Sequence, residues 1–403
     1  MSIRTTTPIA DIKPPTATTG IVGWLHTHLF DTWYNTLITV VLVGLMALAV
    51  GPLVHWLFRA AHWQAMVVNL RLFMVGLYPT EALWRPGALL ILVALLFGGS
   101  AAHGRGITRR ICMALFLLCT VLTLLPTGQA RPITGMAMLA LVAGYSLGRI
   151  LSPRSPLWSV GWLLSLPVAF ILLSGLHRLG LPHVSTTQWG GLMLTLLLAC
   201  VGIGASFPLG LLLALGRQSS LPVIRMMSIL YIELIRGVPL VSILIMFALL
   251  LPLFLPATIT RPDMLLRVMV GLTMFTAAYV AENVRGGLQA IPRGQYEAAT
   301  ALGLSWAQAM RYVILPQALR AVIPALVGQC IALFKDTSLA TVVGLLELLG
   351  IAKNVIEQPQ WKTIPGGVVF EVFGFTALVY FVFNYSMSIA SRRLEQSLGV
   401  GQR

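Results

Sequence analysis

Charged side chains inside long apolar runs are the residues of this chain best placed to do chemistry. The set consists of Glu233, Arg236, Glu282, Lys335 and Asp336. An isolated charge costs at least about 2.5 to 3.5 kcal/mol at the centre of a membrane helix, so these side chains are expected to pair or to face a polar path. Glu233 and Arg236 lie three residues apart, and on a helix they would share a face and could pair. Lys335 and Asp336 could neutralise each other, and we assign them no further role.

Glu282 is the sharper candidate for contact with a solute in transit. It follows Tyr279 by three residues, near the point where a translocation path could narrow. A carboxylate there could receive an α-amino group, so we hypothesise that Glu282 or Glu233 contacts the solute. We place Arg236 on the same path, with a purely structural Glu233–Arg236 pair as the alternative. Pro239 is expected to break its helix and to leave carbonyl groups free for a polar ligand.

The polar stretch from residue 296 to residue 316 has the pattern of two short helices. It reads YEAATALGLSWAQAMRYVILP. The alanine-rich start favours a helix from Tyr296, and Gly303 interrupts that helix. Ser305 can then cap a second helix that begins near Trp306. Pro316 is expected to close the second helix before the next apolar run.

The same stretch resembles the coupling-loop signature of ABC importer permeases. The chain keeps the spacing of that signature at Glu297-Ala298-Ala299, Gly303 and Val313-Ile314-Leu315-Pro316, with Val313 in place of Ile. Ala298 and Ala299 leave the helix surface free of bulk, so a partner's groove could approach closely. The resemblance implies that the loop docks into a cleft of a separate ATPase subunit. The coupling residues would be Glu297, Ala298, Ala299, Gly303, Leu315 and Pro316. The alternative is an ordinary amphipathic linker.

Blocks on both sides of the loop are similar to the permeases of polar amino-acid importers. They are residues 187–217, Tyr231–Leu240, Ala278–Gly287 and Lys335–Leu339. The resemblance covers about residues 187–395, and the long N-terminal half narrows it to the M-type permease of general L-amino-acid (glutamate/glutamine/aspartate/asparagine) transporters. It implies transport of polar L-amino acids with a second permease subunit and a periplasmic amino-acid-binding protein.

Ten apolar runs are long enough to cross a bilayer, which predicts an all-α polytopic membrane protein. They cover residues 36–58, 86–102, 111–127, 133–150, 158–176, 189–215, 237–257, 264–283, 318–341 and 369–390. We expect residues 1–30 to form a flexible cytoplasmic tail and residues 31–180 to form an N-terminal extension of about five helices. Residues 187–395 would contribute the last five, which the resemblance identifies as a type I ABC importer permease core.

Basic residues favour one side of these runs. With both termini in the cytoplasm, most of the Lys and Arg residues lie on the cytoplasmic side, as the positive-inside rule predicts. We expect this membrane to be a bacterial inner membrane. Residues 58–83 fit the rule poorly. Their apolar face (Trp63, Val67, Leu70, Phe73 and Met74) predicts a helix lying along the outer interface, with a re-entrant or buried connector as the equal alternative.

The composition excludes several classes of protein. The chain is 57% hydrophobic and only 10% charged, whereas soluble proteins carry about 25% charged residues. Its net charge of +15 comes from basic residues between apolar runs, which indicates contact with membrane lipid headgroups and no nucleic acid. The four cysteines lie inside apolar runs without metal-ligand spacing, so we predict no metal site.

The sequence contains no G-x-x-x-x-G-K-[ST] run and no evident catalytic set, so we predict a chain that is not an enzyme and binds no cofactor. ATP would be used by the partner subunit. The main rival is a secondary transporter of small polar solutes, driven by an ion gradient. That class predicts two similar halves, whereas here the motifs lie only in the second half. A membrane enzyme would need titratable residues clustered at one interface.

Overall fold

The protein is helical throughout the part of the chain that is described. The computed structural model describes residues 20–103, 107–124, 130–151, 156–256 and 258–397, and no strand occurs among them. Within these residues eight helices are long and apolar enough to cross a membrane, or nine if one bent pair is counted as a span. The all-α polytopic class is thus confirmed, and the predicted count of ten spans was approximate.

The described residues divide into two compact units, with the boundary between Trp63 and Gln64. The first unit contains α1 (Gly20–Leu29), α2 (Trp33–His55) and a π-helical turn (Trp56–Ala60). Thr32 caps α2, since its hydroxyl oxygen accepts the backbone N–H of Asn35 at 3.4 Å. The apolar residues of α2 give the predicted first span.

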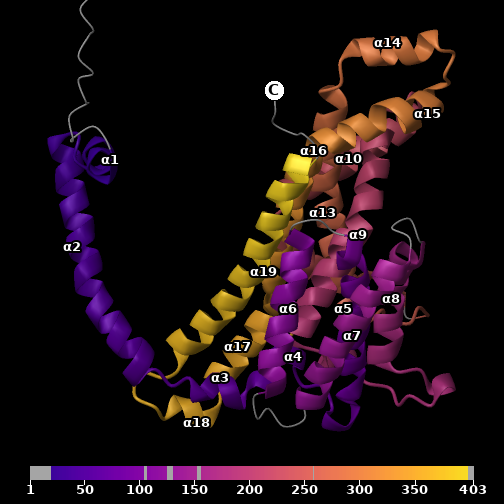
Figure 1. Cartoon of the computed structure of the whole chain (residues 1–403). Helices are drawn as coiled ribbons and strands as arrows, with labels where there is room; N and C mark the ends of the chain where they lie inside the picture. Colours follow the sequence, from indigo (N-terminus) through magenta and orange to yellow (C-terminus); the bar gives the residue numbers. More distant parts are fainter. Residues whose placement is uncertain (1–19, 104–106, 125–129, 152–155, 257, 398–403) are drawn as a thin grey trace, which may run out of the picture. The chain divides into compact units, whose positions relative to one another are not determined.

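The second unit begins with the helices of the N-terminal half (Figure 1). They are α3 (Gln64–Val68), α4 (Leu70–Val75), a 3-10 turn (Thr80–Ala82), α5 (Trp84–His103), α6 (Ile107–Leu124), α7 (Ala130–Ile150) and α8 (Pro156–Ser174). Glycines let α5 and α7 approach closely: a Cβ on Gly98 would lie 2.2 Å from the carbonyl oxygen of Leu141, and one on Gly144 would lie 2.1 Å from that of Leu95. This small-residue packing is typical of membrane helices.

The remaining elements make up the C-terminal half. They are two 3-10 turns (His177–Leu179 and Thr186–Gln188), α9 (Gly191–Arg217), α10 (Pro222–Gly237), α11 (Leu240–Ile245), a π-helical turn (Met246–Leu250), α12 (Leu251–Phe254), α13 (Met264–Gln289), α14 (Arg293–Ala301), α15 (Trp306–Ala309), a second π-helical turn (Met310–Ile314), α16 (Leu315–Asp336), a 3-10 turn (Thr337–Val343), α17 (Leu348–Ile356), α18 (Pro359–Lys362) and α19 (Val369–Ser397).

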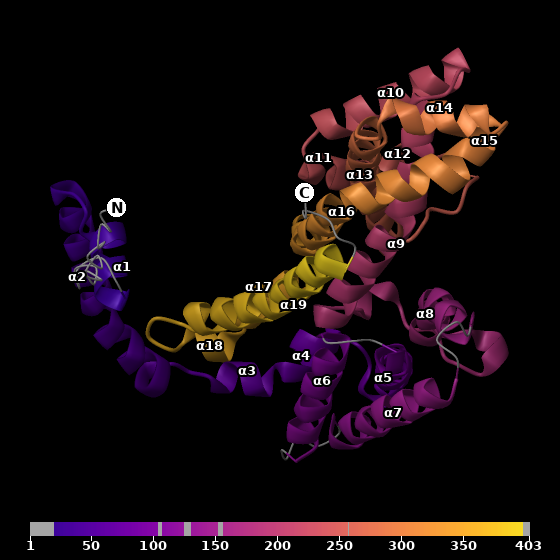
Figure 2. The ribbon, with the colours of Figure 1, turned by 45° about the horizontal axis from the view of Figure 1, so that its top comes forward.

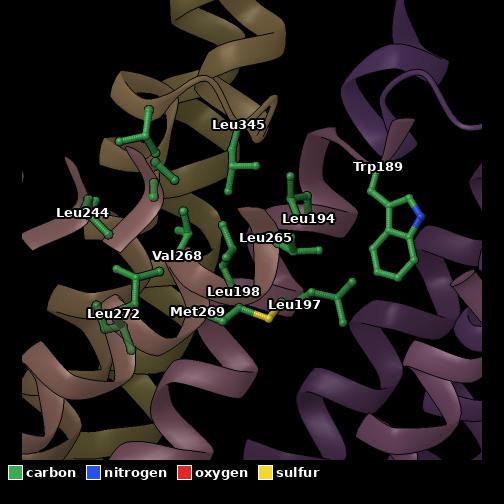
Figure 3. Packing of buried hydrophobic residues seen from close by; sticks show 14 of the residues in the cluster. Trp189, Leu194, Leu197, Leu198, Leu244, Leu265, Val268, Met269, Leu272 and Leu345 are labelled. Atoms are coloured by element: carbon green, nitrogen blue, oxygen red, sulfur yellow. The ribbon is translucent and has the colours of Figure 1, made fainter. Parts of the chain in front are cut away.

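The largest apolar cluster of buried residues lies between α9 and α13. Leu194 and Leu198 of α9 pack with Leu265 and Val268 of α13, and Leu345 closes the cluster (Figure 3). Trp189 extends it towards the N-terminal half, because its ring lies 6.0 Å from that of Phe170 on α8. The two halves of the second unit thus share one core.

The predicted seventh span, residues 237–257, is not a single straight helix. α10 ends at Gly237, α11 begins at Leu240, and the helices on the two sides of this break are bent by 107°. Pro239 lies at the break, where its missing N–H and the clash of its ring with the preceding residue, the extended Val238, prevent a continuous helix. The expectation of a break at Pro239 is therefore confirmed, whereas the span boundaries were wrong, and residue 257 lies outside the described residues.

Two other predicted segments can be compared with the structure. Within residues 58–83 the second unit has α3 and α4, whose buried Met66 and Phe73 pack with α17 and α19 residues. The ring of Phe73 lies 5.1 Å from that of Phe375, while Val67 is 73% exposed. Residues 64–75 therefore form a partly buried connector, which is one of the two predicted alternatives, and not one interfacial helix. The predicted span 111–127 corresponds to α6, which is not among the eight candidate spans, and residues 125–127 lie outside the described residues.

Candidate functional site

The predicted loop forms two short helices beyond the end of the helical bundle (Figure 1). α14 begins at Arg293, three residues before the predicted start at Tyr296, because Pro292 breaks the preceding chain. The helix ends at Ala301, and Gly303, two residues later, has a φ of +71°. The N–H of Leu304 donates to the Ala299 oxygen at 3.1 Å, and that of Gly303 to the Thr300 oxygen at 2.9 Å. These bonds form a Schellman motif, which favours glycine at this position.

The second helix is capped as the sequence predicted. The Ser305 hydroxyl oxygen accepts the backbone N–H of Gln308 at 3.4 Å, and the N–H of Ser305 donates to the Gln308 side chain at 2.9 Å. This reciprocal pair is a capping box. Pro316 does not close the helix, however. It lies in the first turn of α16, and the chain from Trp306 runs on as one long helical segment.

The loop exposes large apolar side chains around Gly303. Leu302 is 78% exposed, Trp306 is 61% exposed, and Tyr312 is also exposed. Ala298 is exposed as expected, but Ala299 is only 2% exposed, because α14 packs against α15 and the following π-helical turn. Of the two alanines, only Ala298 contributes to an accessible surface.

Polar contacts hold α14 on the neighbouring helices. The Gln317 side-chain amide of α16 donates to the Gln295 side-chain oxygen of α14 at 3.1 Å. The Tyr296 hydroxyl donates to the carbonyl oxygen of Leu288 at 3.4 Å, and burial raises the pKa of this phenol above its ordinary value. The first turn of α14 is therefore positioned by contacts with α13 and α16.

A cluster of five charged side chains joins α9, α10 and α13. Its members are Arg217, Glu233, Arg236, Glu282 and Arg285. Arg285 donates from both Nε and Nη2 to the two carboxylate oxygens of Glu282, the first at 2.9 Å. Arg217 and Arg236 each place a guanidinium nitrogen 3.7 Å from the same carboxylate. Glu282 therefore lies at the centre of the cluster, which carries one net positive charge.

Glu233 and Arg236 reach this cluster without pairing with each other as expected. Glu233 accepts from Arg217 at 2.9 Å, while Arg236 faces Glu282. The guanidinium of Arg236 also lies 5.6 Å from the Tyr279 ring centroid, and its Nε is buried without a hydrogen-bond partner. The structure thus brings together the three residues predicted for a translocation path. Outside this cluster, Lys335 is exposed and Asp336 is half-buried at the end of α16.

Glu347 is an organising residue that the sequence analysis missed. It is fully buried, and its carboxylate accepts the N–H groups of Leu349 and Gly350 at 2.9 and 2.8 Å. The hydroxyl of Tyr380 on α19 donates to it at 2.9 Å. An acidic residue directly before an apolar helix is a helix-start signal, and this signal could have identified the cap.

No group of three or more His, Cys, Asp or Glu side chains able to hold a metal ion occurs among residues 20–103, 107–124, 130–151, 156–256 and 258–397.

Comparisons with known proteins place this geometry in context. Residues 206–400 match the family described as binding-protein-dependent transport system inner membrane component. The chain is 37% identical to the inner membrane amino-acid ABC transporter permease protein YhdY of Escherichia coli K12, covering 94% of this chain and 93% of that protein.

Other relatives match nearly the whole chain or about half of it. The glutamate/glutamine/aspartate/asparagine transport system permease protein BztC of Rhodobacter capsulatus is 36% identical, and the match covers 97% of this chain and 96% of that protein. The probable glutamine ABC transporter permease protein GlnP of Bacillus subtilis is 38% identical over 51% of this chain and 91% of its own length. Among solved structures, a crystal structure of an amino acid ABC transporter with histidines is 33% identical over 51% of this chain and 92% of that one, with a TM-score of 0.46.

Proposed function

Because the chain belongs to the family of inner-membrane components of binding-protein-dependent transport systems, we propose that it is the permease subunit of an ATP-driven importer of polar L-amino acids. The permease would form the path through the bacterial inner membrane. ATP would be hydrolysed by a separate ATPase subunit, so this chain would need no cofactor of its own.

The loop of α14 and α15 is the observation that carries the proposal. The loop extends beyond the bundle (Figure 1). On the two sides of Gly303 the side chains of Leu302 and Trp306 are exposed. Exposed apolar side chains outside the hydrocarbon region mark a surface for a protein partner. We assign the ATPase contact to this surface, with Glu297, Ala298 and Gly303 at its first helix. Leu315 and Pro316 would transmit the motion into α16, and Ala299 would support the loop from inside.

The polar amino-acid substrate rests on the relatives whose names state one. YhdY is named for amino acids, and BztC for glutamate, glutamine, aspartate and asparagine. The charged cluster around Glu282 supports a path for such solutes, because its carboxylates and guanidinium groups offer partners for α-amino and carboxylate groups. Glu233, Arg236 and Glu282 would contact the amino acid in transit.

The importer would have further subunits. We propose a homologous second permease subunit, a periplasmic amino-acid-binding protein that delivers the substrate, and contact with membrane lipid. Both termini would lie in the cytoplasm, on the side of the coupling loop, which the distribution of basic residues favours. The ion-gradient-driven transporter is not favoured, because the relatives that match nearly the whole chain are ABC transporter permeases.

Uptake of labelled amino acids tests the proposal. A strain deleted for this chain should lose uptake of polar amino acids, and the intact chain should restore it only when the ATPase subunit is present. Competition by acidic, amide and basic amino acids would define the range. Uptake by this chain in the absence of any ATPase subunit would instead support the gradient-driven alternative.

A further inference from the structure

The arginines of the N-terminal half have few acidic partners in their own part of the chain. Between Glu81 and Glu233 the sequence contains no Asp or Glu. Within the N-terminal half, this interval contains the arginines Arg85, Arg105, Arg109, Arg110, Arg131, Arg149, Arg154 and Arg178. An arginine at the surface of a membrane helix bundle without a nearby carboxylate attracts an anion from its surroundings.

The helices α6 and α7 are neighbours (Figure 2), and a groove with a volume of about 240 Å³ runs between them. One wall comes from α6, where Arg109, Cys112, Met113 and Phe116 follow each other at helical spacing and so share a face. The opposite wall includes Val142 and Tyr145 of α7. The groove is therefore apolar along its length, with a guanidinium at one end.

The side chains at the floor of this groove are buried, whereas those along its walls are exposed. Cys112 and Leu141 are buried in a small apolar cluster with α5 residues, so they form the floor. Met113, Phe116 and Val142 are 56%, 40% and 46% exposed, so the described chain leaves about half of each side chain open. Within a bilayer such a groove is filled by the acyl chain of a lipid, and the shape of the groove then selects which lipid binds.

The basic end of the groove collects several arginines. α6 and α7 are consecutive helices, and the Thr123 hydroxyl donates to that of Thr134 at 3.1 Å where α6 ends and α7 begins. The opposite ends of the two helices therefore carry Arg109 and Arg110 on α6 and Arg149 on α7. All three side chains are exposed. A phosphate at this end would meet guanidinium groups from both helices.

We propose that the groove between α6 and α7 binds an anionic phospholipid. One acyl chain would lie along Met113, Phe116 and Val142, and the phosphate would accept hydrogen bonds from Arg109, with Arg149 adding charge. Basic pockets between transmembrane helices recognise anionic headgroups in this way, and guanidinium–phosphate bonds are among the stronger hydrogen bonds. The N-terminal half would thus carry a lipid site of its own, independent of the transport pathway.

Lipid retention by the full-length protein tests this site. The protein would be reconstituted in nanodiscs of phosphatidylcholine containing phosphatidylglycerol as the probe, and bound phosphatidylglycerol would be counted by native mass spectrometry. Arg109→Gln should lower the affinity about fivefold, the effect of removing one basic residue at a membrane surface. Met113→Trp should lower it by filling the groove, and Arg109→Lys should largely retain it.

The control is Arg131→Gln, which removes an exposed arginine at the other end of α7 and should leave retention unchanged. Equal retention by the wild type, Arg109→Gln and Met113→Trp would overturn the proposal. An equal loss in Arg131→Gln would also overturn it, because this loss would indicate general attraction by positive charge. Equal retention of phosphatidylcholine and phosphatidylglycerol by the wild type would overturn it as well.

Discussion

The guanidinium of Arg285 binds both carboxylate oxygens of Glu282, its neighbour one turn earlier on α13, with Nε 2.9 Å from Oε2. Because Arg217 on α9 and Arg236 on α10 face the same carboxylate, Glu282 connects three helices. The carboxylate is thus a structural centre as well as a candidate contact for the solute. Loss of the structural role would lower the stability of the protein, whereas loss of a contact with the solute would lower uptake.

Neutralising Glu282 should be more damaging than neutralising Glu233. The Glu282 side chain is 22% exposed and faces three arginines, whereas that of Glu233 is 55% exposed and faces one. Removing one partner of a fully buried ion pair costs about 3 to 5 kcal/mol, so we expect about 2 kcal/mol for Glu282→Gln in this partly exposed cluster. For Glu233→Gln we expect roughly 0.5 kcal/mol.

Thermal unfolding in nanodiscs would measure these effects, and uptake would be measured beside it. Equal shifts in the two variants would contradict the central position of Glu282. Normal uptake by both well-folded variants would rule out a contact of either carboxylate with the amino acid.

Gly303 should tolerate no side chain without loss of loop stability. No atom lies within 4 Å of the position that a Cβ would occupy, so the cost of Gly303→Ala comes only from its φ of +71° and should be about 1 to 2 kcal/mol. Gly303→Pro should be worse, because proline fixes φ near −65° and removes the N–H bonded to Thr300.

The matched control is Gly294→Ala. Gly294 is an exposed glycine within α14 and also has open space around it, so alanine should be neutral or slightly stabilising there. Hydrogen exchange of residues 293–309 would measure the loop, and the ratio of ATP hydrolysed to amino acid imported would measure coupling. We expect Gly303→Pro to stay in the membrane but to uncouple the two. Identical exchange and coupling in the Gly303→Pro and Gly294→Ala proteins would refute the assignment.

Ala298 and Ala299 should respond differently to a negative charge. Ala299 is 2% exposed, so Ala299→Asp would bury a carboxylate without a counter-ion and should disrupt α14 itself. Ala298 is exposed, so Ala298→Asp should leave the loop folded and weaken only the contact with the ATPase. Limited proteolysis of the loop would show the first effect, and co-purification of the ATPase the second. An intact loop in Ala299→Asp would show that its burial does not matter.

Tyr296 should make the loop sensitive to alkaline pH. Burial raises the pKa of its phenol above the ordinary 10.0, so the folded loop retains a proton that the unfolded loop loses first. The loop should therefore be fully stable below pH 10.0 and lose stability as the pH rises from there through the raised pKa of Tyr296. Proteolysis of the loop at increasing pH would show this loss. Tyr296→Phe should remove it, whereas Tyr312→Phe, at an exposed tyrosine, should not.

Local signals in the sequence predicted the features that neighbouring residues determine. Gly303 and Ser305 ended and capped the loop helices as predicted, because turn and cap chemistry depends on a few adjacent residues. The break at Pro239 was predicted for the same reason. The long apolar runs of α9, α13 and α19 likewise predicted their helices, although the helix boundaries differ by several residues.

Features that depend on distant residues could not be predicted. Arg217 pairs with Glu233 only because α10 packs beside α9, and no spacing in the sequence shows this. The burial of Ala299 depends on how α14 packs on the next turn of chain. α10 carries Arg225 and Arg236 within an apolar sequence, so hydropathy alone did not reveal where the bent pair begins.

Photo-cross-linking at Leu302 tests the central claim most directly. A photoreactive residue at this position, which is 78% exposed beside Gly303, should cross-link to the ATPase subunit in the assembled transporter. The control is Leu212, which is 66% exposed on α9 and lies within a candidate membrane span. We predict a cross-link to the ATPase from position 302 and none from position 212. No ATPase cross-link from position 302, in a complex that imports amino acids normally, would contradict the account.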